Sequence, residues 1–288
     1  MDVENDRTYP GRSAVSRSRS TRQGLFSGSR LLLSAGTLPR AGFRQRVEAA
    51  SAAGFDAISL FPQQYLHARR KEKLSTASMV AILEEHGVDV DEVDPLLDWF
   101  GQGSSGSEQL LFEMADALGA RSINAAPAFA PRCSLDDLTR AFAGVCDRVS
   151  AHGLRVDLEF LPWTMVPDLN TALDVVQRSE RDNAGVMLDC WHFFRGGSEP
   201  ADIDRLDQQQ AARINSIQVN DAPVRPARLG ARQKLGMAAV MLDNARDGLQ
   251  VMGARRFALV ASSAHNPHPD AMDLMKEASG MRLLPGQG

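Results

Sequence analysis

The chain has 288 residues, of which 43% are hydrophobic, and its formal net charge at pH 7 is −4. This length and composition suit one domain with a single large core. The isoelectric point of about 5.9 argues against a protein that holds the phosphate backbone of a nucleic acid on a broad basic face. No apolar run reaches the roughly 18 residues of a membrane span. The sequence therefore predicts no nucleic-acid or membrane partner, and it allows a homo-oligomer.

Residues 1–30 differ in composition from the rest of the chain. They are rich in Ser and Arg and poor in large apolar side chains, which predicts a disordered leader, with a transit peptide or an anion-binding arm as alternatives. The three cysteines, Cys133, Cys146 and Cys190, form no CxxC pair. This cysteine usage is typical of a reduced, cytoplasmic protein.

From residue 31 onward, helical stretches end at a glycine and a short apolar run follows at once. Gly54, Gly87, Gly119 and Gly153 are separated, by subtraction of their numbers, by 33, 32 and 34 residues. Glycine ends helices because it accepts the left-handed conformation. We therefore expect parallel strands with helical crossovers. Their predicted places are near residues 31–35, 57–61, 88–93, 121–126, 154–160, 185–189, 214–220 and 256–261.

Eight such strands favour a single (β/α)₈ TIM barrel over residues 31–288. The alternative, a doubly wound open sheet, would need a GxGxxG loop after the first strand, and LLLSAGTLPRAGF has none. The helix expected after residue 134 shows the packing pattern most clearly. Ser134 is a suitable N-cap. The apolar stripe that follows consists of Leu138, Phe142, Val145 and Val149.

In such barrels the active groups lie where the strands end, so the residues there are candidates for chemistry. Glu159 interrupts the apolar run VDLEFLPWT, and a buried carboxylate needs a metal or a basic partner; a structural ion pair is the alternative. In GVMLDCWHFFRGG, Asp189 and His192 are suitable metal ligands, whereas Arg195 could bind a phosphate or carboxylate. Asp189 could equally cap the next helix.

The remaining strand ends carry weaker candidates. Gln218 and Asn220 share one face of the strand INSIQVNDAP, where they could contact a ligand or form a turn. Glu92 and Asp94 lie at the end of the third strand, with Trp99 after them, and Asn124 ends the fourth strand. These residues could hold sugar hydroxyls, or they could be polar loop residues without a ligand.

The series of motifs LSAGTLP, AISLFPQQY, DEVDPLLDW, LEFLPWT, GVMLDCWHFFRGG and IQVNDAP resembles the sugar phosphate isomerase/epimerase group over roughly residues 31–223. That group shares the xylose-isomerase-like barrel with the type 2 AP endonucleases. The resemblance implies one divalent metal, Mn²⁺ or Mg²⁺, held by Glu159, Asp189 and Gln218. It also implies that Glu159 and His192 are catalytic and that Arg195 faces an anionic substrate group.

The chain departs from this pattern at the eighth strand. The family places a Glu there, as a metal ligand and base, but RRFALVASSA has no carboxylate. His265 and His268 are candidate substitutes. Either residues 228–270 are an insertion, or the region is rebuilt with helices at 231–252 and 270–279 around a strand at 256–261. The eighth βα unit is therefore expected to be irregular.

Three functions follow from these residues. The first is a metal-dependent isomerase or epimerase that moves a proton next to a carbonyl of a sugar, sugar phosphate or related hydroxy-ketone, through an enediolate. The second is a lyase or dehydratase, which starts with the same proton abstraction. The third is a non-catalytic barrel that has lost the strand-eight acid. An AP endonuclease fits least, because its several metals need many His ligands and the chain has six His.

Overall fold

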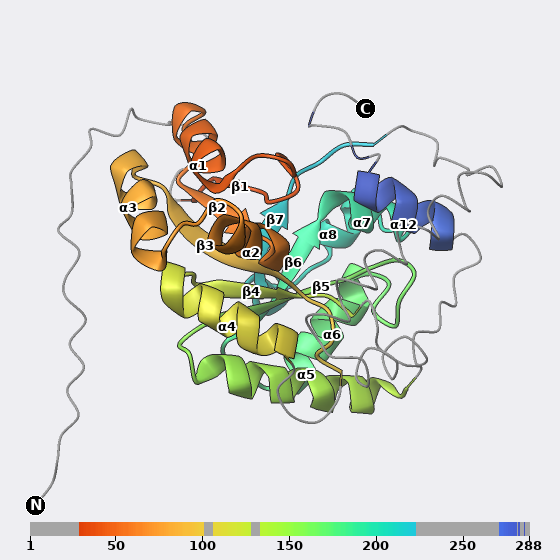
Figure 1. The fold of residues 1–288 in the computed structure, drawn as a ribbon. Coiled ribbons are helices and arrows are strands. Elements are labelled where there is room, and N and C mark those ends of the chain that lie inside the picture. Colours follow the sequence, from red (N-terminus) through yellow and green to blue (C-terminus); the bar gives the residue numbers. More distant parts are fainter. Residues whose placement is uncertain are drawn as a thin grey trace, which may run out of the picture. The chain divides into compact units, whose positions relative to one another are not determined.

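The computed structural model describes residues 29–100, 106–127, 133–222, 271–280, 282 and 285. Its centre is a parallel sheet whose seven strands are neighbours in chain order and curl as a barrel does (Figure 1). This strand order confirms the predicted barrel scaffold, because in a doubly wound sheet the order of the strands would reverse at a switch point. The strands are β1 (Leu32–Leu33), β2 (Ala57–Leu60), β3 (Asp89–Leu96), β4 (Ser122–Ala125), β5 (Arg155–Glu159), β6 (Ala184–Asp189) and β7 (Ile214–Gln218).

Helices connect successive strands and cover the outside of the curled sheet (Figure 1). Their amphipathic faces pack on the strands, as crossover helices of α/β folds do. The helices are α1 (Phe43–Ala52), α2 (Pro62–Arg70), α3 (Thr76–His86), α4 (Gly106–Leu118), α5 (Leu135–Ser150), α6 (Leu169–Ser179), α7 (Cys190–Arg195), α8 (Pro200–Asp204), α9 (Gln208–Ala211) and α12 (Ala271–Gly280).

The local signals read from the sequence are present in the structure. Gly54, Gly87, Gly119 and Gly153 all have φ between 62° and 77°. These left-handed turns lead from a helix directly into a strand, as predicted. Ser134 caps α5, and its hydroxyl accepts a hydrogen bond from the Asp137 amide at 3.1 Å. The four predicted apolar residues of α5 are buried.

Most apolar side chains form one core between the helices and the outer face of the sheet. A second, smaller cluster joins the loops after β4, β5 and β6 to helix α12. Its buried members are Ala126, Leu161, Trp163, Trp191 and Leu274. The carboxyl ends of the strands thus have an apolar lining of their own.

Nearer the amino ends, β6 and β7 are out of regular register. Asn215 has no partner in the ladder, as expected for a bulge residue. Its amide donates to Oδ1 of the buried Asp157 at 2.6 Å. The amide passes over Gly185, where a Cβ atom would lie 1.9 Å from the Asn215 nitrogen. Burial raises the pKa of Asp157, although the Asn215 hydrogen bond acts to lower it.

Two sequence expectations need revision or fall outside the described residues. Strand β3 continues past residue 93 to Leu96, so Glu92 and Asp94 lie within the strand and not at its end. Several predictions lie outside the described residues: positions 1–28 of the leader, the strand at 256–261, the helix at 231–252, and both His265 and His268. Helix α12 corresponds to the helix expected at 270–279. Among the described helices, none combines the length and apolarity needed to cross a membrane.

Candidate functional site

Three potential metal ligands converge at the carboxyl ends of β5 and β6. Glu159 is the last residue of β5, Asp189 is the last residue of β6, and His192 lies in the helix that follows. Each offers one ligand atom, and these atoms all lie within 4.8 Å of one another. All three residues are buried. The structure therefore brings together the acid–His set that the strand ends predicted.

Asp189 both caps α7 and points a second oxygen into this cluster. Oδ1 accepts a hydrogen bond from the His192 amide at 2.9 Å, which is an N-cap contact. Oδ2 accepts from the Asn220 amide at 3.0 Å and from Nη1 of Arg282 at 2.5 Å. The two readings of Asp189 left open by the sequence are thus compatible, because its two oxygens have different partners.

The ionised form of Asp189 is favoured despite its burial. Burial alone would raise the pKa of its carboxyl. The opposing influence of His192 and the guanidinium of Arg282, with hydrogen bonds from the His192 and Asn220 amides, holds the pKa below its usual value. A charged carboxylate is the form that binds a cation.

His192 is enclosed by aromatic rings. The indole rings of Trp163 and Trp191 meet it edge-on, with centroid distances of 5.5 and 5.1 Å. Its Nε2 lies 3.3 Å from Oε1 of Glu159, whereas its Nδ1 is buried and has no hydrogen-bond partner in the part of the chain that the structure describes. The aromatic wall fixes the ring so that Nε2 faces the acids.

Asn124, at the end of β4, links two buried carboxylates. Its amide nitrogen donates to Oδ1 of Asp94 at 2.9 Å and to Oε2 of Glu159 at 2.8 Å. Its own Oδ1 is buried, and no described residue donates a hydrogen bond to it. Burial, reinforced by the charge of Glu159, raises the pKa of Asp94 to about 8, so this carboxyl is neutral at pH 7. Burial raises the pKa of Glu92 well above its usual value, and Asp94 adds to the rise.

The two residues predicted at the end of β7, Gln218 and Asn220, lie at the same cluster. Asn220 donates to Asp189, and its own Oδ1 is buried without a hydrogen-bond partner among the described residues. Gln218 donates from Nε2 to Oγ of Ser34, beyond β1, at 3.4 Å, and its Oε1 lies 3.3 Å from Nη1 of Arg282. Gln218 thus spans from the seventh strand toward the first at the mouth of the barrel.

Arg195 and Trp99 do not face this cluster as ligand-binding groups. The Nε atom of Arg195 donates to Oε1 of Glu277 in α12 at 2.9 Å, so its guanidinium pairs with a protein carboxylate. Trp99 is buried in the main core, where its indole nitrogen donates to the Ala126 carbonyl at 3.0 Å. An aromatic platform for a sugar needs an exposed ring face, which Trp99 lacks.

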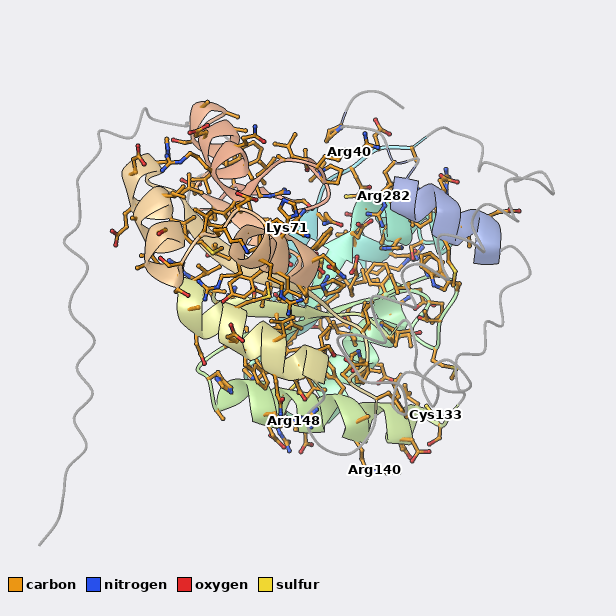
Figure 2. All side chains as sticks on the ribbon, in the orientation of Figure 1. Arg40, Lys71, Cys133, Arg140, Arg148 and Arg282 are labelled. Carbon is orange, nitrogen blue, oxygen red and sulfur yellow. The ribbon has the colours of Figure 1, made fainter. Side chains whose placement is uncertain are left out.

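The sequence analysis did not identify Glu277 or Arg282. Glu277 is fully buried and also accepts from the indole nitrogen of Trp191 at 3.0 Å. Arg282 reaches Asp189, His192 and Gln218 from just beyond α12 (Figure 2). The contacts of Glu277 and of Arg282 join segments that are more than 60 residues apart in the chain, so no local sequence pattern predicts them. The one feature of the sequence that could have indicated these two residues is the polar segment MKEASGMR, which lies beside an apolar helix face.

A small pocket next to the cluster is lined in part by residues of α7. Its volume is about 190 Å³, below the roughly 300 Å³ at which ligand pockets usually begin. Its lining residues are Cys190, Trp191, Phe194, Arg195, Asn220, Asp221 and Ala222. It shares Asn220 with the site but does not include Glu159, Asp189 or His192.

The donor set fits a divalent metal. Two carboxylates and an imidazole are ligands that Mn²⁺ and Zn²⁺ both accept, and Gln218 can add an amide oxygen. The buried acids need a positive partner, which a metal would supply. Ligand type alone does not choose between these metals.

Comparisons with known proteins agree with this architecture. The family model described as xylose isomerase-like TIM barrel matches residues 47–278. The IOLI protein, whose crystal structure holds a zinc atom, superposes with a TM-score of 0.60 at 19% identity, over 71% of this chain and 77% of that protein.

Two curated relatives are enzymes. The inosose isomerase of Bacillus velezensis is 23% identical over 230 residues, which are 75% of this chain and 82% of that protein. The 3-dehydroshikimate dehydratase of Pseudomonas aeruginosa is 26% identical over 203 residues, or 66% of this chain. The chain spans 29% of the length of that dehydratase.

Proposed function

The chain belongs to the xylose isomerase-like TIM barrel family, and on this premise we propose that it is a metal-dependent isomerase or epimerase of a sugar, sugar phosphate or related hydroxy-ketone. One observation carries the proposal: Glu159, Asp189 and His192 offer ligand atoms within 4.8 Å of one another at the active end of the barrel. The similarity to an inosose isomerase over 75% of the chain supports it.

In this proposal Glu159, Asp189 and Gln218 hold a divalent metal, Mn²⁺ or Mg²⁺, and His192 lies beside it and binds the metal or a substrate oxygen. A bound divalent cation would polarise a substrate carbonyl and make the adjacent C–H more acidic. Glu159 takes up that proton and returns it. Asn124 holds Oε2 of Glu159 at 2.8 Å, which keeps the carboxylate oriented during the transfer.

The unpartnered oxygens of the site suit a hydroxylated substrate. Oδ1 of Asn124 and Oδ1 of Asn220 are buried hydrogen-bond acceptors for which the described residues offer no donor. A buried acceptor left unpaired is costly, and sugar hydroxyls are donors that could satisfy both. His192, whose Nε2 lies 3.3 Å from Oε1 of Glu159, is in reach of the same substrate oxygens.

A dehydratase is the second candidate. Loss of a leaving group next to the abstracted proton needs the same base and the same polarised carbonyl. The observation that favours it is the 26% identity to a 3-dehydroshikimate dehydratase over 203 residues. A non-catalytic barrel is the third possibility, and it predicts no proton exchange at all.

Proton exchange in heavy water tests the shared step of both enzymes. The full chain is stripped with a chelator, reloaded with Mn²⁺, Mg²⁺ or Zn²⁺, and incubated with a panel of ketoses, sugar phosphates and cyclic hydroxy-ketones. Proton NMR should show loss of the signal next to the carbonyl for at least one compound. Glu159→Gln should slow this exchange at least about 100-fold.

Glu48→Gln, which alters an exposed carboxylate of α1, is the matched control and should exchange at the wild-type rate. An isomeric product supports the isomerase, whereas an absorbing conjugated carbonyl supports the dehydratase. Absence of exchange with every metal and compound would contradict both.

A further inference from the structure

Three buried side chains on adjacent strands form a hydrogen-bonded row: Asp94 on β3, Asn124 on β4 and Glu159 on β5. The register of the strands explains why they meet. Asn124 pairs with Asp157, and Glu159 lies two residues further along the same face of β5. The strand geometry therefore places an amide between two carboxyl groups, one from each neighbouring strand.

The amide nitrogen of Asn124 serves two acceptors in this row. It donates to Oδ1 of Asp94 at 2.9 Å and to Oε2 of Glu159 at 2.8 Å. The amide oxygen of Asn124 has no donor among the described residues. Because a primary amide has its donors at one end and its acceptor at the other, a reversed Asn124 would bring its oxygen against the Glu159 carboxylate. The contacts therefore define one orientation, with the nitrogen toward the two acids.

Asp94 provides the second of the two acceptors that hold this amide. A single hydrogen bond to Glu159 would leave the amide able to turn about that bond, whereas an acceptor on the other side fixes its plane. Burial, reinforced by the charge of Glu159, raises the pKa of Asp94 to about 8. At pH 7 the Asp94 carboxyl therefore accepts from Asn124 without placing a second negative charge beside Glu159.

The two carboxylate oxygens of Glu159 have separate partners. Oε2 accepts from Asn124, whereas Oε1 lies 3.3 Å from Nε2 of His192. Glu159 also offers a ligand atom to the cluster that it forms with Asp189 and His192. Groups that orient a metal ligand in this way change metal affinity by about 10- to 100-fold when they are removed. The row is therefore in a position to control how Glu159 meets a metal.

We propose that Asp94 is a positioning residue for the metal site: its carboxyl oxygen fixes the amide of Asn124, and Asn124 in turn holds Glu159 in the orientation that binds the metal. Asp94 itself touches neither the metal nor the substrate. Its acceptor oxygen is what the site requires, and its negative charge is not. This role rests on the metal site of the proposed function and adds to it the residue that keeps one ligand in place.

Calorimetric titration of the chelator-treated full chain with Mn²⁺ at pH 7 tests this role without turnover. Asp94→Leu keeps the branched shape but removes the acceptor, so it should bind Mn²⁺ about tenfold more weakly. Asp94→Ala removes the acceptor without adding volume and should behave alike. Asp94→Asn offers an amide oxygen in the same place and should bind as the wild type does. The matched control is Asp98→Leu, at a buried acid of the following loop that accepts from Ser107, and its affinity should be unchanged.

A double-mutant cycle shows whether Asp94 acts through Asn124. Asn124→Ala alone should weaken Mn²⁺ binding by about 10- to 100-fold, because Glu159 loses its donor. In that background Asp94→Leu should cause no further loss, since the amide on which it acts is gone. Additive losses would mean that Asp94 affects the metal by another route, and the proposal would be wrong. Matching far-UV circular dichroism spectra verify that each variant is folded.

The outcomes separate this role from the metal site itself. Weaker binding in Asp94→Leu and Asp94→Ala, with wild-type binding in Asp94→Asn, supports the proposal. Wild-type affinity in all three variants overturns it and leaves the metal site standing. An equal loss in Asp94→Asn, which would point to charge, or in Asp98→Leu, which would point to a general effect of altering a buried acid, also overturns it. Failure of the wild type to bind Mn²⁺, Mg²⁺ or Zn²⁺ overturns the proposed metal dependence together with this role.

Discussion

The main core and the smaller cluster at the barrel mouth are built on different principles. The main core joins helices to the strands next to them in the chain, and nearly all its members are apolar. The mouth cluster surrounds charged groups, and Leu274 joins it from far along the chain. Glu277, Arg282 and Asp189 form their ion pairs beside this cluster. Apolar packing maintains the scaffold, whereas ion pairs between buried charged groups hold α12 and Arg282 at the mouth.

This difference implies separate responses to damage. A change in the main core should lower global stability, because its contacts hold several elements at once. A change at the mouth should act locally, because α12 takes no part in the hydrogen bonding between the described strands. The predictions below test this separation, starting with the largest expected effect.

Phe142→Ala tests the main core. Phe142 is fully buried in α5 and meets the Trp99 ring edge-on at 5.9 Å. We expect the free energy of unfolding to fall by about 3–5 kcal/mol, from lost burial and the cavity left behind. Urea unfolding followed by circular dichroism measures it. Leu110→Ala, at a partly buried position of α4, should cost clearly less. Similar losses for both would remove the distinction between core and periphery.

Glu277→Gln tests the mouth. It removes the charge that two donors, on Arg195 and Trp191, share. We expect a loss of about 2 kcal/mol. Hydrogen exchange should speed up in α12 and stay unchanged in β4 and β5. Glu84→Gln, at an exposed position of α3, should alter neither. Faster exchange throughout the sheet would mean that the mouth and the core unfold as one unit.

Asp94→Asn tests the buried acids beneath the mouth. Asp94 has a pKa of about 8 in the folded chain against 3.8 as the ordinary value, so between these pH values the folded state holds a proton that the unfolded state has lost. Its contribution to stability is complete below pH 3.8 and is lost as pH rises through about 8.

In chelator, the wild type should therefore lose about 1.4 kcal/mol of unfolding free energy between pH 6 and pH 7 from this group. Asp94→Asn should flatten the dependence in that window. Urea unfolding at a series of pH values measures both slopes. An unchanged slope in the variant would mean that Asp94 is ionised in the folded protein.

Ser134→Ala tests the N-cap of α5. The Ser134 hydroxyl accepts from the Asp137 amide at the start of α5, and its loss should cost about 1 kcal/mol. Ser150→Ala, in the last turn of the same helix, is the control and should be close to neutral. A cost below that of the control would show that tertiary packing alone determines where α5 begins.

Much of the scaffold could be predicted from sequence because its determinants are local. Glycine after each helix and apolar residues at helical spacing act within a few residues, and the structure follows them in α5 and at Gly87. The acid–His cluster was predictable in part, because strand ends meet at one edge of a parallel sheet. The burial of Trp99 in the main core was not predictable, since an aromatic residue after a strand can pack in a core as well as contact a ligand.

The partners of the charged groups could not be predicted for a different reason. Arg195 was expected to meet an anionic substrate group, and in the structure it meets Glu277, 82 residues later. Arg282 meets Asp189 across 93 residues. A charged residue at a buried position indicates that an oppositely charged partner is needed. It does not indicate which residue that partner is, because ion pairs have no periodic spacing along the chain.

The bulge near the amino ends of β6 and β7 has a consequence for how this sequence can change over time. The Asn215 amide reaches Asp157 only because Gly185 has no side chain. A substitution at position 185 therefore requires both a smaller residue at position 215 and a shift of the Arg213 carbonyl oxygen, which would lie 3.0 Å from the added Cβ atom, and Asp157 would then lose its donor. In an alignment of relatives, positions 157, 185 and 215 should covary as a trio, and their order of replacement should be the same in independent lineages.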